Sequence, residues 1–560
     1  MMTPPATRDL ERPAETAALR PVADEGRPVR RLDATVPAAV PARPAAAAHG
    51  AASRLLLPAL VLPAILVLGV VLRLYGLGER PFWVDEAATL GIGQLGWGDF
   101  LRHVAWTEAS PPAYYALANF WLDLGPAEEW WLRLPSALAG AAAVPLMYLF
   151  CRRAFGPRAA LIGAALLAVA PAHVRFSQEA RTYALFFLAV LGALLAAQAL
   201  NAAETPRRRW ALAALLAVLA SLPIALHGTG VVAVAAVFVY AGATLLARGQ
   251  ILSLTRLAPL VAAGLGALVI ATPWLLWAIA ILDVPRPVIA WMPPVTVAEA
   301  FDRIKDVLLA PYLTRLAVPV AALQLGALAV AVALCRREAE FLGCLAALAF
   351  ALLAFPVIAL LIEHVLFERT LLFTLVFWIP LLAAGLGAIR RPAVAALALL
   401  LILAPQARSL AIHARMNHYE EYWDLLGERI AAAARPGEAL VGIGVFEAVA
   451  ARHYLRRAGG AELPLAAVGL GYEAPFLPMA RAMLAPRAAW VRPGAAELCA
   501  ALGTVPGLWI AGRGKAGADS RAALEPVLRQ LDARPTGSWR IGSLRLTHWT
   551  APERCPAVGG

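Results

Sequence analysis

Two adjacent carboxylates, Asp85 and Glu86, follow the first long apolar segment of the chain, residues 54–75. That segment is long enough to cross a bilayer, so both acids lie where a membrane helix meets water. Charge at such a place is costly unless it is paired or used. Because neighbouring helical residues point about 100° apart, we expect one carboxylate to face a site and the other to serve the structure. A simpler interpretation is that Asp85 only caps a helix over 86–92, since Asp is a favoured N-cap residue.

Other polar residues near the ends of apolar segments could act together with these carboxylates on a substrate that carries a hydroxyl group and a phosphate. A carboxylate within hydrogen-bond reach can orient and deprotonate a hydroxyl group, and arginine meets a phosphate with a planar, permanently charged fork. Each also has a structural interpretation. Arg181 and Arg369 could be snorkelling to the interface, Glu179 could pair with Arg181, and His227 could be a buried, hydrogen-bonded core residue. Glu108 could join Asp85 or bind a metal ion, and Arg133 and Glu129 are expected to lock helix ends together.

The composition indicates a polytopic membrane protein. The chain has 560 residues, of which 61% are hydrophobic and 15% charged, and its mean hydropathy is +0.69. Repeated apolar segments of membrane length account for these values. The net charge of +12 comes mainly from arginine, which in membrane proteins marks cytoplasmic loops. No basic stripe with interleaved aromatic residues occurs, which argues against a nucleic-acid partner.

The apolar segments after the first predict an all-α polytopic bundle. They are about residues 135–151, 159–174, 182–200, 210–226, 229–247, 257–281, 315–335, 340–362, 369–388 and 392–410. Arginine-rich loops alternate with arginine-poor loops along them, as cytoplasmic and outer loops do. The alternation holds if the short apolar segment 112–124 does not cross fully, and it predicts about 11–13 spans. It places the N-terminus in the cytoplasm and the candidate residues on the outer side.

The two ends of the chain differ from this central part. Residues 1–50 are rich in Ala, Pro and Arg and are predicted to be a disordered cytoplasmic tail. We assign 51–415 to the membrane domain and 416–560 to a small extracytoplasmic α/β domain with strands near 439–445, 489–491 and 508–511 and a closing hairpin at 539–549. Its Gly442-x-Gly444 pair is too weak to indicate a nucleotide site. Cys499 and Cys555 could form a disulfide if this part is exported.

Four blocks within about 100 residues resemble one family of membrane enzymes. The N-terminal half is similar to the GT-C glycosyltransferases, in particular to bacterial relatives of the protein O-mannosyltransferases (glycosyltransferase family 39) and of the lipid A aminoarabinose transferase. The blocks are Trp83–Glu86, Ser110–Tyr115, Glu129–Gly140 and Ser177–Tyr183. Later, His227 and Glu368–Leu372 look like two further family motifs. The chain departs at Ser110, where many relatives have His, and at Thr370, where Tyr is usual.

The resemblance implies a GT-C fold and a sugar transferase that uses a polyprenyl-phosphate-linked donor at the outer face of the inner membrane. The acceptor would be a lipid, a glycan or a protein, and the lipid bilayer is a further partner. By this resemblance Asp85 handles the acceptor hydroxyl, with Glu86 beside it as a second catalytic candidate. The resemblance assigns binding of the donor phosphate to Arg181, Arg369 and His227. It assigns the lining of the substrate cavity to Glu108, Pro112, Tyr114, Gln178 and Glu179. No cofactor is implied with certainty, and a divalent metal ion is left open.

Two other classes of protein fit part of the pattern. A transporter predicts two similar halves with charges at mid-membrane, whereas here the charges gather at one face and no repeat joins the halves. A non-catalytic membrane scaffold predicts that Asp85, Glu86 and Arg369 are all replaceable. The discriminating measurement is sugar transfer by membranes that contain the protein.

Overall fold

The computed structural model describes residues 46–103, 111–280, 296–308, 317–361, 367–469, 477–484, 489–491, 494–503, 505–514 and 518–552. The chain divides into two compact units, Met1–Leu56 and Leu57–Gly560. The first is described only from Ala46. The second holds a helical bundle and a sheet domain.

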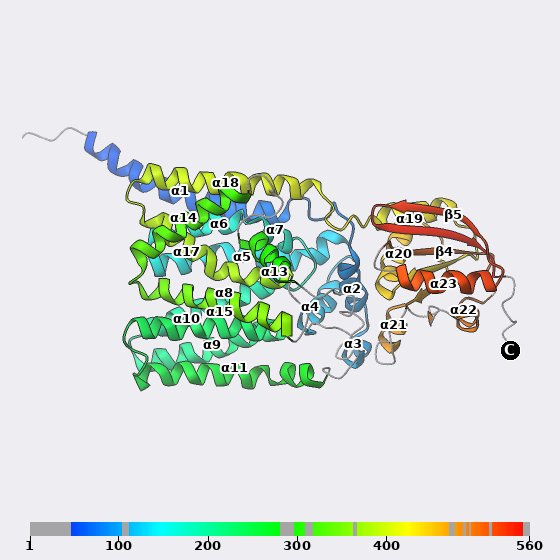
Figure 1. The fold of residues 1–560 in the computed structure, drawn as a ribbon, viewed down its shortest axis with the longest axis horizontal. Helices are drawn as coiled ribbons and strands as arrows, with labels where there is room; N and C mark the ends of the chain where they lie inside the picture. The colour runs from blue at the N-terminus through cyan, green and yellow to red at the C-terminus, as the bar shows by residue number, and fades with distance from the viewer. Residues whose placement is uncertain are drawn as a thin grey trace, which may run out of the picture. The chain divides into compact units, whose positions relative to one another are not determined.

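Long apolar helices form the bundle (Figure 1). They are α1 (Ala46–Leu74), α5 (Glu129–Phe155), α6 (Pro157–Ala168), α7 (Pro171–Ser177), α8 (Tyr183–Ala202), α9 (Pro206–Leu226), α10 (Gly230–Ala247), α11 (Leu254–Ala280), α14 (Ala317–Cys335), α15 (Ala339–Leu361), α17 (Leu375–Ala388) and α18 (Pro392–Arg415). Among the described residues, nine helices are long and apolar enough to cross a membrane, or ten if the bent pair α6–α7 is one span. The all-α polytopic fold is confirmed. The count is below the predicted 11–13 because α6–α7 is broken by 56° and α1 enters the test only as the shorter helix Leu60–Leu74.

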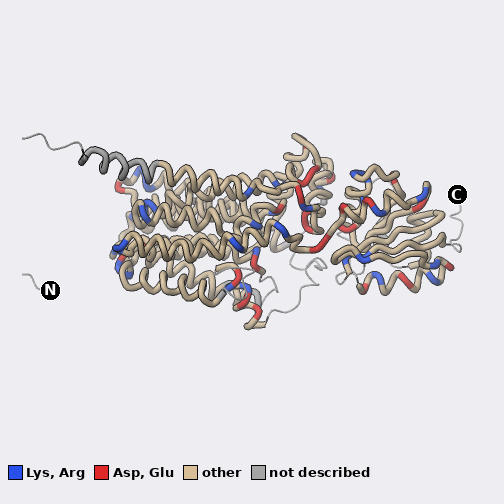
Figure 2. Tube along the Cα trace, turned by 90° about the horizontal axis from the view of Figure 1, so that it is seen from above, with Lys and Arg blue, Asp and Glu red and all other residues tan. Residues whose placement is uncertain are grey.

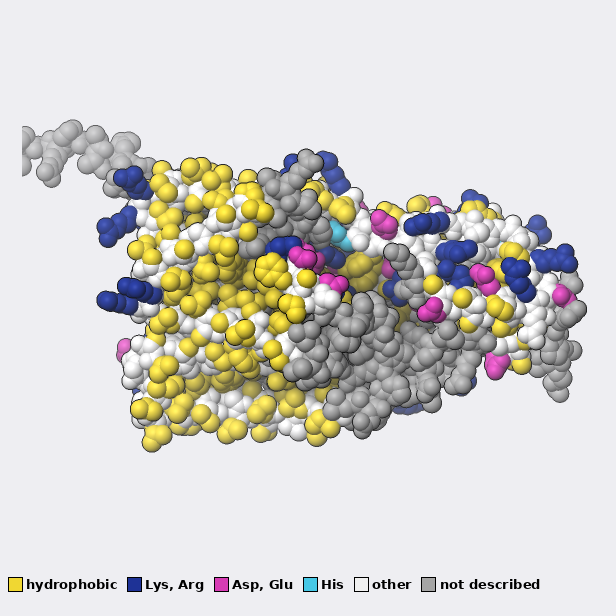
Figure 3. Space-filling view, viewed as in Figure 1, with side chains coloured by type: hydrophobic (Ala, Val, Ile, Leu, Met, Phe, Trp, Pro, Cys, Tyr) yellow, Lys and Arg dark blue, Asp and Glu magenta, His cyan; other side chains and the backbone are white. Residues whose placement is uncertain are grey.

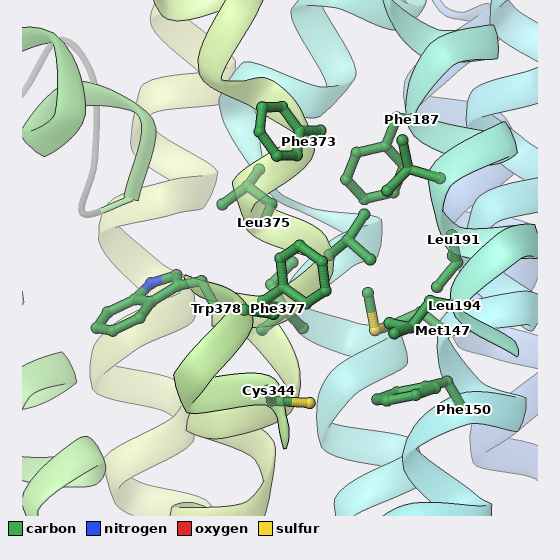
Figure 4. Close-up of a cluster of buried hydrophobic side chains, with 14 of the residues drawn as sticks. Met147, Phe150, Phe187, Leu191, Leu194, Cys344, Phe373, Leu375, Phe377 and Trp378 are labelled. Carbon is green, nitrogen blue, oxygen red and sulfur yellow. The ribbon is translucent and has the colours of Figure 1, made fainter. Parts of the chain in front are cut away.

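Burial separates central from peripheral helices. The span Glu368–Ala388 is 89% buried, whereas α11 and α18 are each 22% buried in their most apolar window. Figure 3 shows hydrophobic side chains over the visible face of the bundle, as expected of a surface in contact with lipid. The interior is packed by large side chains from α5, α8, α15 and α17 (Figure 4). The bundle is therefore a close-packed scaffold that can hold polar groups at its end in fixed positions.

Short helices accompany the long ones. They are α2 (Val84–Gly93), α3 (Trp97–His103), α4 (Ala113–Leu122), α13 (Val297–Leu308), α16 (Glu368–Leu371) and the 3₁₀ turn η2 (Leu372–Thr374). Of these, α2, α3 and α4 lie at the end of the bundle that borders the sheet domain (Figure 1). Helix α4 has 10 residues, too few to cross a bilayer, as the sequence predicts. Figure 2 shows basic residues gathered at the opposite end of the bundle.

The C-terminal domain is a six-stranded sheet with helices on both faces. The strand order is β3-β2-β1-β4-β6-β5, parallel from β3 to β4 and antiparallel from β4 to β5. The strands are β1 (Ala439–Ile443), β2 (Leu465–Val468), β3 (Ala489–Val491), β4 (Gly507–Arg513), β5 (Pro535–Ile541) and β6 (Leu544–Thr550). Helices α19 (Trp423–Ala433), α20 (Val445–Arg457) and α21 (Leu477–Leu484) pack on one face. Helices α22 (Ala495–Leu502) and α23 (Ala518–Gln530) pack on the other.

The small α/β domain and its closing hairpin are confirmed, but β2 and α21 were not predicted. Strand β2 is a run of four small and apolar residues after a proline, which has no alternation to reveal it. Cys499 is disulfide-bonded, and Cys555 lies outside the described residues. One apolar cluster joins residues of α2 to α19, α20 and α21, so the sheet domain and the segment between α1 and α5 share a core.

Candidate functional site

Helix α2 carries both predicted carboxylates in its first turn. It begins at Val84, its N-cap residue is Trp83, and no side chain caps it from that position. Asp85 therefore lies inside the helix, and its interpretation as an N-cap is wrong. Two glycines let α2 lie close to its neighbours. A Cβ atom on Gly91 would lie 2.3 Å from Met483 Cε, and one on Gly93 would lie 2.9 Å from Leu122 Cδ1.

Asp85 meets Arg369, which is 284 positions later in the chain. Arg369 Nη1 lies 3.4 Å from Asp85 Oδ2, and the Asp85 side chain stays 28% exposed. The guanidinium group also lies over the rings of Trp83 (5.8 Å) and Phe367 (4.9 Å). The prediction that an acid and an arginine from distant segments converge at one end of the bundle is confirmed. Their catalytic and phosphate-binding roles remain predictions.

Glu86 has a structural place instead of the predicted catalytic one. Its side chain is fully buried. Arg133 donates to it through Nε (2.8 Å to Oε1) and Nη2 (2.6 Å to Oε2), and the Ala180 backbone N–H donates to Oε1 at 2.7 Å. A carboxylate that accepts three hydrogen bonds and faces no solvent has no room for a substrate hydroxyl. Glu86 instead ties α2 to α5 and to the turn before α8, and Arg133 locks helix ends as expected.

Arg181 braces α2 from the side. Its Nη1 donates to Tyr115 Oη (2.9 Å), to the Asp85 carbonyl oxygen (3.1 Å) and to Thr89 Oγ1 (3.4 Å). The side chain is 8% exposed. Arg181 thus fixes the backbone that carries Asp85, and whether it also meets a phosphate stays a prediction. Tyr114 is buried with Oη 3.0 Å from Ser136 Oγ, and Pro112 is buried at the start of α4.

His227 lies at the C-terminal end of α9, outside the membrane-spanning segments, and is held in one tautomer. The Thr229 backbone N–H donates to its Nδ1 at 3.1 Å, so we assign the ring proton to Nε2. Burial, with smaller contributions from the charges of Arg369 and Arg181, lowers the pKa of His227 to about 3. The free protein therefore presents a neutral imidazole here, which can donate a hydrogen bond to a phosphate oxygen but adds no charge.

Gln178 and Glu179 belong to the same end of the bundle and are engaged by the protein. Gln178 Nε2 donates to the carbonyl oxygens of Leu72 and Tyr75, so it closes the end of α1. Glu179 Oε1 accepts from Tyr419 Oη at 3.2 Å, and burial raises the pKa of this carboxyl group. Glu179 Oε2 is buried and has no hydrogen-bond partner among the described residues. Glu179 pairs with Arg175 at 3.6 Å, not with Arg181.

The three residues before Asp85 are each held by the C-terminal part of the chain. The Phe82 backbone N–H donates to Tyr454 Oη at 2.6 Å. The Trp83 ring stacks on Tyr419 with centroids 3.7 Å apart. The Val84 N–H, an orphan donor at the start of α2, donates to Glu421 Oε2 at 2.8 Å. We call these contacts the C-terminal clamp. No sequence pattern revealed it, because its partners lie more than 330 positions apart and show no motif.

Glu421 should give the protein a pH-dependent stability. Burial raises its pKa from 4.5 to about 7. The folded state therefore holds the proton more tightly than the unfolded state, so stability falls as pH rises from about 4.5 to about 7. The share of this one group is on the order of 3 kcal/mol. Glu421 Oε2 accepts from the Val84 N–H and from Trp423 Nε1, the latter at 2.9 Å. We expect Glu421→Gln, whose amide oxygen still accepts both hydrogen bonds, to lose that share of the pH dependence and to be more stable than wild type at pH 8.

Thermal unfolding in detergent at pH 5 to 8 measures this. The exposed Glu428→Gln on α19 is the matched control and should keep the wild-type profile. If Glu421→Gln and Glu428→Gln follow the same curve, the carboxyl group of Glu421 does not titrate in this range.

A metal site is not apparent in the described part of the chain, where no three His, Cys, Asp or Glu side chains gather suitably. Glu108, one of the predicted cavity residues, lies outside the described residues. Arg80 and Arg175 were not predicted as site residues, although both flank the recognised blocks. Arg80 Nη2 donates to Gln178 Oε1 at 2.7 Å, and Arg175 pairs with Glu368 at 3.2 Å.

The comparisons with known proteins agree on the kind of fold. Residues 109–277 match the family described as dolichyl-phosphate-mannose-protein mannosyltransferase. The structure of ArnT from Cupriavidus metallidurans bound to undecaprenyl phosphate is similar with a TM-score of 0.57 at 15% identity, over 90% of this chain and 99% of ArnT. Its apo structure gives a TM-score of 0.55 at 14% identity, over 91% and 100%. No curated protein sequence matches the chain significantly.

The family match and the structural match cover different lengths of the chain. The matched segment begins just before α4 and ends in α11, so it contains Arg133, Arg181 and His227 but neither Asp85 nor Arg369. The structural similarity extends over nearly the whole chain. The resemblance to the GT-C glycosyltransferases that the sequence blocks predict is thus confirmed, with a fold shared with ArnT over 90% of the chain.

Proposed function

We propose that this protein transfers a sugar from a polyprenyl-phosphate donor to an acceptor hydroxyl group at the outer face of the inner membrane. The observation that carries the proposal is the Asp85–Arg369 pair at the rim of the bundle. ArnT, with the similar fold, has been crystallised with undecaprenyl phosphate, and the chain of a lipid of the same class would lie against the apolar helices of the bundle.

The pair supplies both groups that the reaction needs. The acceptor oxygen attacks the anomeric carbon, the bond from that carbon to the phosphate oxygen breaks, and its electron pair leaves with the polyprenyl phosphate. Asp85 accepts the proton of the acceptor hydroxyl group. Arg369 meets the negative charge of the leaving phosphate. The ion pair is weak because its atoms are 3.4 Å apart and both side chains are partly exposed. A donor phosphate can therefore bind Arg369 in place of Asp85, and the freed carboxylate can then bind the acceptor hydroxyl group.

The other residues hold this arrangement. Arg181 and the C-terminal clamp fix the backbone on both sides of Asp85. His227 Nε2 is a neutral donor for a phosphate oxygen. The disulfide-bonded Cys499 supports an extracytoplasmic C-terminal domain, because disulfides persist in oxidising compartments.

The direct test is transfer by the purified protein in nanodiscs that contain polyprenyl-phosphate sugars with a radiolabel on the sugar. Release of free polyprenyl phosphate is measured as well as labelled product, because it reports turnover whatever the acceptor is. A wild-type protein that releases polyprenyl phosphate from none of the hexose and pentose donors, with membrane extract supplied as acceptor, would argue against the proposal.

Arg369→Lys should weaken the reaction at the phosphate. Lysine keeps the charge but lacks the planar fork. Losing one charge-assisted hydrogen bond costs about 1.5–3 kcal/mol, which is roughly a 10- to 100-fold fall in kcat/KM. Steady-state kinetics with the lipid-linked donor measure this. Arg102→Lys is the control, since Arg102 on α3 is exposed and pairs only with Asp99 among described residues. Equal kinetics for the two variants would remove Arg369 from donor binding.

A further inference from the structure

A polar pocket lies between α2 and α20, apart from the Asp85 site. It has a cavity volume of about 330 Å³, which is within the range of small-ligand sites. Its charged lining is Arg452, Arg456 and Arg457 of α20, together with Glu128 before α5. Leu90 and Gln94 close it from α2. By helical geometry Leu90 lies about 140° around α2 from Asp85, so the pocket opens on another face of that helix. We call it the α2–α20 pocket.

The guanidinium groups of this pocket are unevenly paired. Three arginines stand beside three carboxylates, Glu128 in the lining and Glu129 and Glu462 behind it, but among the described residues only Arg457 and Arg456 form an ion pair with a carboxylate. Arg457 donates to Glu129 Oε2 at 2.5 Å, and Arg456 bonds Glu462 in a pair that is more than half exposed, where such pairs contribute little. Arg452 donates to the carbonyl oxygens of Met483 and Leu484, which neutralise nothing.

The spacing along α20 brings like charges together. Arg452 and Arg456 are four residues apart, so they lie one above the other on the same helix face. Such a pair disfavours the helix by about 0.2–0.5 kcal/mol. His453, also in the lining, has a buried Nε2 with no hydrogen-bond partner among the described residues. An anion in the pocket would relieve the repulsion.

The neighbouring surface places the pocket near lipid headgroups. Glu128 Oε2 accepts from the indole N–H of Trp130 at 2.7 Å, and Trp130 is 42% exposed. Exposed apolar side chains continue with Trp97 on α3, Phe120 on α4 and Leu124 just after α4. Tryptophan at this density is typical of the membrane–water interface. Arginine side chains at that level attract anionic headgroups by the same electrostatic interaction that acts at the cytoplasmic leaflet.

We propose that the α2–α20 pocket binds the phosphate of an anionic lipid headgroup, and that bound lipid joins the sheet domain to the segment between α1 and α5. The donor site is separate. Lipid binding here would stabilise the contact between α2 and α20, and with it the C-terminal clamp that holds Asp85.

The test compares the full-length protein in nanodiscs of phosphatidylcholine alone with discs that also contain phosphatidylglycerol. We expect phosphatidylglycerol to raise the unfolding temperature of the wild type. Retention of phosphatidylglycerol, measured by native mass spectrometry, should fall about fivefold in Arg456→Gln, since one arginine contributes about 1 kcal/mol to an anionic headgroup. Glu128→Gln removes the one acidic lining residue and should raise retention by a similar factor.

Arg529→Gln is the matched control, because Arg529 is an exposed arginine of α23 on the other face of the sheet. It should behave as wild type. Unfolding in phosphatidylcholine discs shows whether Arg456→Gln is folded, and Arg456 is exposed enough that folding should survive. Inorganic phosphate at constant ionic strength forms a second arm. If both phosphatidylglycerol and inorganic phosphate stabilise the protein, and both effects depend on Arg456, the pocket binds phosphate from lipid headgroups and from solution. Equal retention in Arg456→Gln, Arg529→Gln and wild type overturns the proposal.

Discussion

Asp85→Asn should lower sugar transfer by about 10²–10⁴-fold, the usual contribution of a positioned general base. Asparagine keeps the size and one acceptor oxygen of the side chain but cannot take the proton of the acceptor hydroxyl group. The effect should appear in kcat more than in the KM for the donor, because Arg369 and His227 are untouched. The measurement is release of polyprenyl phosphate by purified protein in nanodiscs.

The fold should be unaffected by this change. Asp85 is 28% exposed and makes one side-chain ion pair at 3.4 Å among the described residues, so its removal costs little stability. The control is Asp99→Asn on α3, an acid that is 48% exposed and pairs with Arg102. It makes the same chemical change in the same segment between α1 and α5. Unchanged turnover in Asp85→Asn, or an equal loss in Asp99→Asn, would take Asp85 out of the chemistry.

The sequence predicted the bundle and the side of the membrane on which the site should lie. Apolar segments long enough to span a membrane can be recognised from the sequence alone, because the backbone hydrogen bonds of such a helix all form within the helix itself. Counting arginine-rich loops placed Asp85 and Arg369 on the same side, which their contact confirms, whereas the outer location of that side stays a prediction. The resemblance supplied the roles of the residues, which no spacing could supply.

The division of labour between Asp85 and Glu86 could not be read from the sequence alone. Both lie in the first turn of one short helix, and what separates them is a partner 47 positions away, Arg133, which reaches Glu86 and not Asp85. The C-terminal clamp was equally hidden. Tyr419 and Glu421 sit in a short linker between α18 and α19 with no motif, and only the folded chain brings them to residues 82–84. Long-range polar contacts of this kind need the tertiary structure.

Arg133→Met should be the most destabilising of these substitutions, at about 3–5 kcal/mol, the cost of leaving one member of a buried ion pair without its partner. Both side chains are at most 4% exposed. The change strips two hydrogen bonds from Glu86 and also removes the donor to the carbonyl oxygens of Leu77 and Arg80. The start of α2 would lose its anchor to α5, and transfer should fall together with the amount of folded protein.

Unfolding in detergent with increasing denaturant measures the loss, and Arg152→Met is the control on the same helix, since Arg152 is exposed at the far end of α5. The double variant Glu86→Gln/Arg133→Met distinguishes a broken ion pair from simple loss of volume. Without the stranded charge it should be more stable than Arg133→Met, because coupled residues do not add their costs. Two outcomes would contradict this role of the Glu86–Arg133 pair. Arg133→Met could be as stable as Arg152→Met, or adding Glu86→Gln could destabilise Arg133→Met by as much as it destabilises the wild type. In either case the pair does not hold α2 in place, and the C-terminal clamp alone would position Asp85.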